Sequence, residues 1–234
     1  MAIDFGRIDV VSFDCYGTLI DWESGILSAL ASFRSEFNPR ATDDEMLEQY
    51  AALETVMETG EYLLYKDVLR GVMRGFARRA SVLEERFDAD LLVNSLPNWP
   101  PFPDTVGSLR RLKQRYRLAI ISNTDDDLIA QTARSLEVPF DFVVTAQQVG
   151  AYKPSTRNFS YALDTFKVPK ERWLHAAQSR FHDIAPARSL GISTVWVNRR
   201  EGKKSHGATA PSRATPDLEV PSLSALADLA EAAR

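Results

Sequence analysis

Cysteine is almost missing from this chain, since Cys15 is the only one among 234 residues. A single cysteine cannot build an internal disulfide framework, which is compatible with a reducing compartment. Long apolar runs are also absent, and 26% of the residues are charged, which argues against membrane insertion and against disorder. The first residues lack a basic region followed by an apolar one, so we expect no export signal and a cytoplasmic protein.

Basic residues are not in excess either. The formal net charge of −4 at pH 7 gives no reason to expect nucleic acid as a partner. Between Ala41 and Tyr65 there is no basic residue at all, whereas seven acidic residues occur there, and we expect most of them to form a solvated helix face. Residues 199–213 contain five basic residues, and we interpret this stretch as a solvated loop.

The stretch from Val10 to Leu19 is an apolar run that ends in an acid, a glycine and a hydroxyl. Its valines favour a buried parallel strand, and Gly17 favours a turn at the end of that strand. Asp14 therefore lies at the carboxyl edge of the predicted strand. Open α/β sheets bind their ligands at this edge, because the loops that leave the strands converge there.

Apolar residues then recur at helical spacing over residues 22–98, with Asp21 as a predicted N-cap and Thr42–Glu45 as a predicted capping box. Four prolines between Pro97 and Pro103 end this helical section. Strands and helices alternate from there on, which predicts a parallel sheet with helices on both faces. The further predicted strands are 118–122, 142–144, 173–177 and 194–197.

We therefore predict an α/β fold, a doubly wound parallel sheet. Residues 1–21 and 99–234 are expected to form this core domain. Residues 22–98 are expected to form a helical cap domain that is inserted into it.

Short motifs at the predicted strand ends resemble those of the haloacid dehalogenase superfamily. The segment 13–19 (FDCYGTL) resembles its first motif, whose first aspartate is a nucleophile; 122–123 (SN) resembles the second motif and 152–154 (YKP) the third. The resemblance implies a Rossmann-like core and the following catalytic residues: Asp14, Thr18, Ser122, Lys153 and Asp183. Taken alone, each has an ordinary explanation as a cap, a turn or a surface residue, so the prediction depends on their combination.

Two departures from the superfamily pattern narrow the chemistry. Phosphatases of the superfamily have a second aspartate where Tyr16 stands, so Tyr16 resembles the branch that attacks carbon, the 2-haloacid dehalogenases. The loop 177–183 offers only Asp183 where metal-dependent members have two acids, so we expect no metal and no cofactor. The resemblance also implies that Asp183 helps to activate water. A metal-dependent phosphatase acting on small phosphate esters remains the alternative.

The dehalogenases use a cap arginine to bind the substrate carboxylate, and this chain has no basic residue in the corresponding stretch. Arg180 is a candidate replacement, although a salt bridge at the rim explains it equally well. Segments such as 13–23, 58–60 and 98–100 resemble a ring-opening branch, the azetidine-2-carboxylate hydrolases. That branch displaces a ring nitrogen, which must leave protonated, and His182 and Tyr16 are the candidate proton sources.

The predicted reaction is thus hydrolysis of a bond between carbon and a halogen or ring nitrogen at C2 of a small carboxylic acid. The predicted partner is this substrate, without nucleic acid or membrane, and the sequence leaves a homodimer open. The candidate substrate-binding residues are Tyr16, Asn123, Tyr65, Trp99, Tyr152, Gln178, Arg180 and His182.

Overall fold

A single parallel sheet organises the computed structural model, which describes residues 3–203 and 205–233. Its six strands lie in the order β3-β2-β1-β4-β5-β6, and all neighbouring strands are parallel. The strands are β1 (Val10–Phe13), β2 (Arg117–Ser122), β3 (Phe142–Thr145), β4 (Trp173–Ala177), β5 (Ser193–Val197) and β6 (Leu218–Val220). The predicted α/β fold is confirmed. Strand β6 was not predicted, because its three residues are too few to show a strand pattern.

Helices occupy the connections between the strands. They are α1 (Trp22–Phe37), α2 (Asp43–Glu58), α3 (Tyr65–Arg79), α4 (Leu91–Ser95), α5 (Thr105–Lys113), α6 (Asp126–Ser135), α7 (Ala146–Val149), α8 (Arg157–Phe166), α9 (Ala185–Ser189) and α10 (Leu223–Ala232). A five-residue π-helical turn, Arg180–Ile184, precedes α9. Each helix in the described part of the chain is too short or too polar to cross a lipid bilayer.

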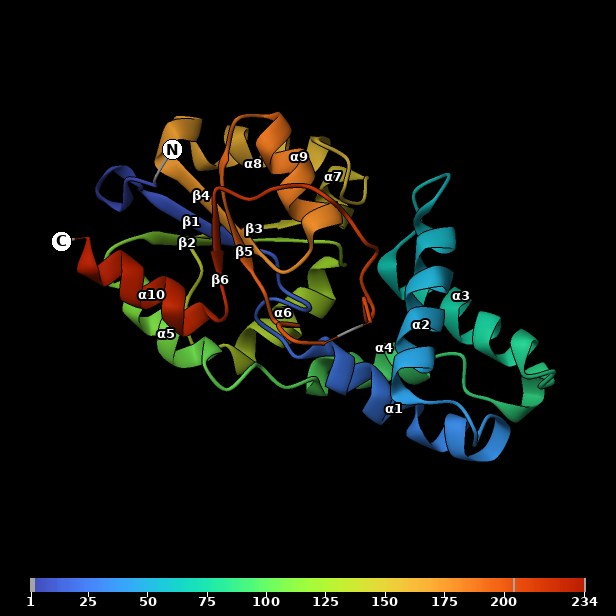
Figure 1. Cartoon of the computed structure of the whole chain (residues 1–234). Helices are drawn as coiled ribbons and strands as arrows, with labels where there is room; N and C mark the ends of the chain where they lie inside the picture. Colours follow the sequence, from blue (N-terminus) through green and yellow to red (C-terminus); the bar gives the residue numbers. More distant parts are fainter. Residues whose placement is uncertain (1–2, 204, 234) are drawn as a thin grey trace.

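Helices cover both faces of the sheet, as Figure 1 shows: α7, α8 and α9 lie on one face, and α5, α6 and α10 on the other. Strand β2 illustrates how the sequence produces this arrangement. Ala119 and Ile121 pack into the core cluster of the first face, whereas Leu118 and Ile120 pack into that of the second. Successive side chains of a strand point to opposite faces, so an unbroken apolar run is the pattern of a strand buried on both.

Strand β1 lies in the middle of the sheet, between β2 and β4, and its four residues are buried. Asp14 follows it directly, and the chain then turns at Gly17, whose φ is 92°. A Cβ atom at this glycine would lie 2.9 Å from the Trp22 side chain, so both the backbone angle and the space favour glycine. The turn therefore fixes Asp14 at the centre of the carboxyl edge.

The helical segment 22–98, which contains α1 to α4, lies beside this edge in Figure 1. Two predicted helix starts are confirmed: Asp21 accepts a hydrogen bond from the Ser24 backbone, and Thr42 forms a capping box with Glu45. Helix α1 packs closely onto Trp99, because a Cβ atom at Gly25 would lie only 2.3 Å from the Trp99 ring. The division into domains stays a prediction.

Residues 199–203 and 205–213 form a loop, but the prediction that this loop is merely solvated is wrong. The side chains of Arg199 and Arg200 are 8% and 11% exposed, and they form ion pairs with Asp104 and Glu23. Ion pairing explains the burial, since a charge leaves water readily only when a partner replaces the water. Lys204, which also belongs to this stretch, lies outside the described residues.

Candidate active site

Lys153 joins two acidic residues that lie far apart in the sequence. Its ammonium nitrogen Nζ lies 2.9 Å from Asp14 Oδ1 and 2.6 Å from Asp183 Oδ1, and it donates a third hydrogen bond to the carbonyl of Ile121 at 2.9 Å. The lysine is 1% exposed. These contacts use its three N–H donors, so the ammonium is fixed in direction as well as position.

The Asp14 carboxylate is held at both oxygens. Thr18 donates its hydroxyl to Oδ2 at 2.8 Å, while Lys153 donates to Oδ1. Thr18 is itself oriented, because its oxygen accepts the backbone N–H of Gln178 at 2.9 Å. One donor per oxygen leaves a lone pair free on each. Asp14 is therefore oriented without losing its capacity to act as a nucleophile.

Burial and charge act against each other in this cluster. Burial raises the pKa of Asp14 above its usual value, and the contact with Lys153 limits the increase. Burial lowers the pKa of Lys153, but the two carboxylates outweigh it and raise that pKa above its ordinary value. Burial also opposes ionisation of Asp183, yet Lys153 and His175 hold its pKa below the usual range. The lysine is thus a permanent cation beside ionised Asp183.

A chain of buried hydrogen bonds supports Asp183 from behind, and the sequence did not reveal it. Trp173 donates its indole N–H to Ser12 Oγ at 2.6 Å, Ser12 lies 2.8 Å from His175 Nδ1, and His175 Nε2 lies 3.0 Å from Asp183 Oδ1. If the serine hydroxyl donates to Nδ1, Nε2 carries the proton that bonds the carboxylate. In the sequence, the only indication of this hydrogen-bond chain is that two polar residues, Ser12 and His175, occur within otherwise apolar strands.

A small cavity of about 40 Å³ lies in front of Asp14. This is room for a few water-sized groups, so a ligand that fits it has few heavy atoms. Its lining residues come from both the strand ends and the helical segment: Asp14, Tyr16, Trp22, Glu54, Glu58, Tyr65, Ser122, Asn123, Lys153, Gln178, Ser179, His182, Asp183 and Thr209. Lys153 is the only lysine or arginine among the described residues that line it.

Two acids of this lining, Glu54 and Glu58, were not predicted as site residues. Both belong to α2, in the acidic stretch that we expected to be mostly solvated. Burial raises the pKa of Glu54 to about 7 and that of Glu58 well above its ordinary value. The sequence places them one helical turn apart, but only the packing of α2 shows that they face Asp14.

Five of the eight predicted substrate-binding residues line the cavity: Tyr16, Asn123, Tyr65, Gln178 and His182. The pKa of His182 is lowered to about 4 by burial, so the imidazole is neutral near neutrality. Tyr16 is also protonated, because burial raises its pKa well above the ordinary value, and its hydroxyl lies 2.8 Å from Thr132 Oγ1. In this arrangement Tyr16 already has a hydrogen-bond partner away from Asp14.

The other three predicted residues lie outside the cavity. Arg180 donates to the carbonyl of Ala214 at 2.8 Å and stacks on the Trp196 ring, 4.8 Å from its centroid. Tyr152 donates to the carbonyl of Leu63, and the Trp99 indole donates to Ser95. The candidate role of Arg180 as the carboxylate-binding residue is therefore not supported by its position. Its guanidinium is engaged by β5 and the loop that follows.

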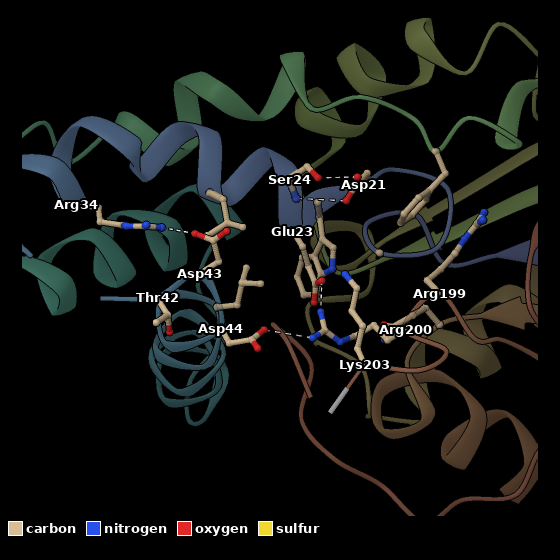
Figure 2. A pocket seen from close by; sticks show the side chains of 16 residues that line it. Asp21, Glu23, Ser24, Arg34, Thr42, Asp43, Asp44, Arg199, Arg200 and Lys203 are labelled. Atoms are coloured by element: carbon tan, nitrogen blue, oxygen red, sulfur yellow. Dashed lines mark hydrogen bonds and ion pairs between the residues drawn. The ribbon is translucent and has the colours of Figure 1, made fainter. Parts of the chain in front are cut away.

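A larger cavity of about 780 Å³ adjoins the small one, and Trp22 and Gln178 line both. Figure 2 shows it between the helical segment and the loop after β5. Arg200 lies between two acids there: it pairs with Glu23 of α1, and its Nη2 lies 3.5 Å from Asp44 Oδ1 of α2. These ion pairs join the loop to the helical segment.

Three or more acidic, histidine or cysteine side chains do not meet in a metal-binding arrangement anywhere in residues 3–203 and 205–233. The acids nearest to Asp14 are instead joined by Lys153 or held by hydroxyl groups.

A buried aspartate held by a lysine and a threonine at the centre of a parallel sheet edge is the arrangement of an aspartate-nucleophile hydrolase. Residues 8–191 match the model of the haloacid dehalogenase-like hydrolases, and the chain belongs to this family. The predicted family is thereby confirmed. Its curated relatives place the chain in the 2-haloacid dehalogenase branch.

The chain is 27% identical over 216 residues to the (S)-2-haloacid dehalogenase H-109 of Pseudomonas putida, which covers 90% of this chain and 95% of the relative. It is 25% identical over 232 residues to the haloacetate dehalogenase H-2 of Moraxella sp. (strain B), covering 95% and 98%. The fold is that of the L-2-haloacid dehalogenase from Xanthobacter autotrophicus, solved with chloropropionic acid covalently bound. That comparison has a TM-score of 0.79 at 21% identity and covers 96% of this chain and 98% of the other.

Proposed function

We propose that this hydrolase breaks the bond between C2 and a ring nitrogen in a small cyclic amino acid such as azetidine-2-carboxylate. The observation that carries the proposal is the charge of the cavity. Glu54 lines the cavity from α2 and, in the described structure, is held only by the Tyr50 and Tyr65 hydroxyl groups, and Arg180 lies elsewhere. An anionic haloacid would meet repulsion from this lining, whereas a protonated ring nitrogen would be attracted by it.

The first step is attack by Asp14 on C2. A carboxylate oxygen of Asp14 forms a bond to C2, the C2–N bond breaks, and its electron pair goes to nitrogen. The nitrogen enters protonated and therefore leaves as a neutral amine, so this step needs no additional proton. Lys153 and Thr18 hold the carboxylate in position, and the small cavity limits the substrate to a few heavy atoms.

The second step is hydrolysis of the Asp14 ester. Water attacks the acyl carbon and passes one proton to Asp183, and the resulting oxyanion is stabilised by Lys153. The acyl bond to the product oxygen then breaks, and this oxygen takes up the proton from Asp183. The proton that remains on the Asp14 carboxyl group is released to solvent, which restores the carboxylate. Asp183 is proposed to help the water, because its carboxylate is ionised and its Oδ2 has no hydrogen-bond partner in the described structure. The product is a 2-hydroxy acid that carries an amino group at the end of the opened chain.

Dehalogenation of a 2-haloacid is the second candidate, and the names of the curated relatives favour it. It would use the same ester on Asp14, with halide as the leaving group. A halide leaves as an anion without a proton, so this reaction gives the acids of α2 no function.

A panel of substrates tests the proposal. L-azetidine-2-carboxylate, 2-chloropropionate, chloroacetate and a phosphate ester with Mg²⁺ are incubated with the wild-type protein. Products are identified by mass spectrometry, halide release and phosphate release. We expect the cyclic amino acid to give the highest kcat/KM. Turnover of the haloacids with an intact azetidine ring would contradict the proposal, and phosphate release that a chelator abolishes would indicate a phosphatase.

A further inference from the structure

Glu54 is a buried carboxylate with an unusual set of partners. Its side chain lies on α2, the residue is 6% exposed, and Oε1 accepts hydroxyl hydrogen bonds from Tyr50 at 3.0 Å and from Tyr65 at 2.8 Å. The two hydroxyl oxygens lie 3.1 Å apart. Two neutral donors fix the direction of the carboxylate, but they do not neutralise its charge.

The structure gives Glu54 no cationic partner among the described residues, although buried acids are ordinarily paired with a base. The nearby lysine, Lys153, is already engaged by Asp14 and Asp183. A cationic group of a ligand could therefore pair with Glu54 inside the cavity that Asp14 also lines.

An independent observation on the same cavity points to the other end of a ligand. Ser122 is 1% exposed, it lines the cavity, and its hydroxyl has no hydrogen-bond partner in the described structure. A buried hydroxyl without a partner costs free energy unless a ligand supplies one. The cavity therefore contains an acid that lacks a cation and a hydroxyl that lacks an acceptor. A small molecule with both an ammonium and a carboxylate group supplies both.

We propose that Glu54 binds the protonated ring nitrogen of the substrate and is the residue that selects a cationic leaving group, with Tyr50 and Tyr65 as positioning residues. This inference rests on the proposed function. The ionised carboxylate accepts an N–H bond from the ring ammonium, and Ser122 donates its hydroxyl to the substrate carboxylate. When the C2–N bond breaks, the electron pair goes to nitrogen, and the neutral amine keeps both of its protons.

Glu58 is less suited to this role. It is half-buried and lies where the cavity joins a neighbouring one of about 570 Å³, which it also lines. Burial and the charge of Glu54 raise its pKa well above the ordinary value, so Glu58 is the acid that stays protonated. Of the two acids, Glu54 therefore carries the charge when a cation is bound.

The variant Glu54→Gln tests the proposal, because the amide keeps the shape of the side chain and removes its charge. The matched control is Glu48→Gln, which changes an exposed acid on the same helix. We expect kcat/KM for L-azetidine-2-carboxylate to fall about 100-fold in Glu54→Gln, since a charge-assisted hydrogen bond is lost, and to stay within about twofold in the control. Glu54→Asp keeps the charge and should recover part of the loss.

A pH profile separates this role from a merely structural one. The titratable groups around Glu54 are Tyr50, Tyr65, Tyr152, Asp14 and Glu58, and its own pKa is about 7. Because the ionised form binds the cation, kcat/KM should rise with pH through about 7 in the wild type, and this limb should vanish in Glu54→Gln. If that variant does not fold, Tyr65→Phe is used instead: it removes a donor to the carboxylate and should move the limb to higher pH.

Two results would overturn the inference in distinguishable ways. A wild-type protein that leaves the azetidine ring intact would refute the proposed function together with the role of Glu54. Ring opening by folded Glu54→Gln at the wild-type rate, with an unchanged pH limb, would refute the role of Glu54 alone.

Discussion

The two cavities between the helical segment and the sheet edge differ in how their charges are balanced. In the large cavity, Arg200 pairs with Glu23 and Asp44, and Arg34 pairs with Asp43. The small cavity is lined by four acids and one lysine, Lys153, which pairs with only two of the acids, Asp14 and Asp183. Charges that the protein neutralises itself hold elements together, whereas a buried acid without a cationic partner has a raised pKa or, as we propose for Glu54, pairs with the cation of a ligand. On the proposed function, this difference distinguishes structural ion pairs in the large cavity from a ligand site in the small one, although Trp22 and Gln178 line both cavities.

The largest expected effect comes from Asp14→Asn in the small cavity. An amide is a far poorer nucleophile of nearly the same shape, so turnover of every substrate should be lost. A single turnover of the wild type in ¹⁸O-water, with enzyme in excess, tests the covalent step. The label should enter the peptide that contains Asp14 and not the product hydroxyl, because water attacks the acyl carbon. Labelled product with an unlabelled Asp14 peptide would show direct attack by water.

The second-largest effect is expected for Lys153→Met. Its kcat should fall by about 100-fold to 1,000-fold, because one preorganised charge is lost from a buried site. Rates are measured together with a thermal unfolding curve, which shows whether the variant is folded. Lys66→Met is a suitable control, since Lys66 pairs with Asp127 in a partly exposed ion pair. A folded Lys153→Met protein with a normal rate would make this lysine a structural residue only.

Glu54 should also make stability depend on pH, because folding raises its pKa from 4.5 to about 7. Below pH 4.5 the group is protonated in both states, and its contribution is fully present; the contribution is lost as pH rises through about 7. The loss amounts to about 3 kcal/mol in the free energy of unfolding. Relative to the wild type, Glu54→Gln should therefore gain stability between about pH 5 and pH 8. Denaturant unfolding of the wild type and of Glu54→Gln at several pH values measures this gain. A difference in the free energy of unfolding that does not change with pH would contradict the prediction.

The smallest effect on turnover is expected in the large cavity. Arg200→Met removes the pairs with Glu23 and Asp44, so we expect a loss of about 1 to 2 kcal/mol in the free energy of unfolding. The change in kcat should stay within about threefold, since none of these side chains lines the cavity of Asp14. A loss of turnover as large as that of Lys153→Met would mean that the two cavities are not functionally separate.

The sequence predicts the sheet and the strand-end residues because both follow from local patterns. Unbroken apolar runs indicated the strands, and the carboxyl ends of parallel strands meet at one edge, which brings Asp14, Ser122 and Asp183 together. Lys153 reaches the same place from the loop after α7. A motif of a few residues was enough for each of them.

The contributions of the helical segment and of the long loop could not be predicted in this way. Glu54 lines the same cavity as Asp14 only because α2 packs with that side toward the sheet edge, and the acidic sequence of the helix does not show which side that is. Thr209 enters the cavity through the irregular loop after β5. Arg180, a candidate for carboxylate binding, lies outside the cavity because its side chain stacks on Trp196, whereas Asp183, three residues later in the same π-helical turn, points inward.

The central position of β1 also has a consequence for the order in which the chain becomes active during synthesis. Strand β1 is the first of the six strands to be synthesised, but its two neighbours in the sheet, β2 and β4, begin only at Arg117 and Trp173. The helices of the segment 22–98 contact one another locally and can form earlier. The cluster of Asp14, Lys153 and Asp183 therefore cannot form until most of the chain has left the ribosome. Activity is expected to arise in one late event, when the last acid of the cluster reaches the sheet edge.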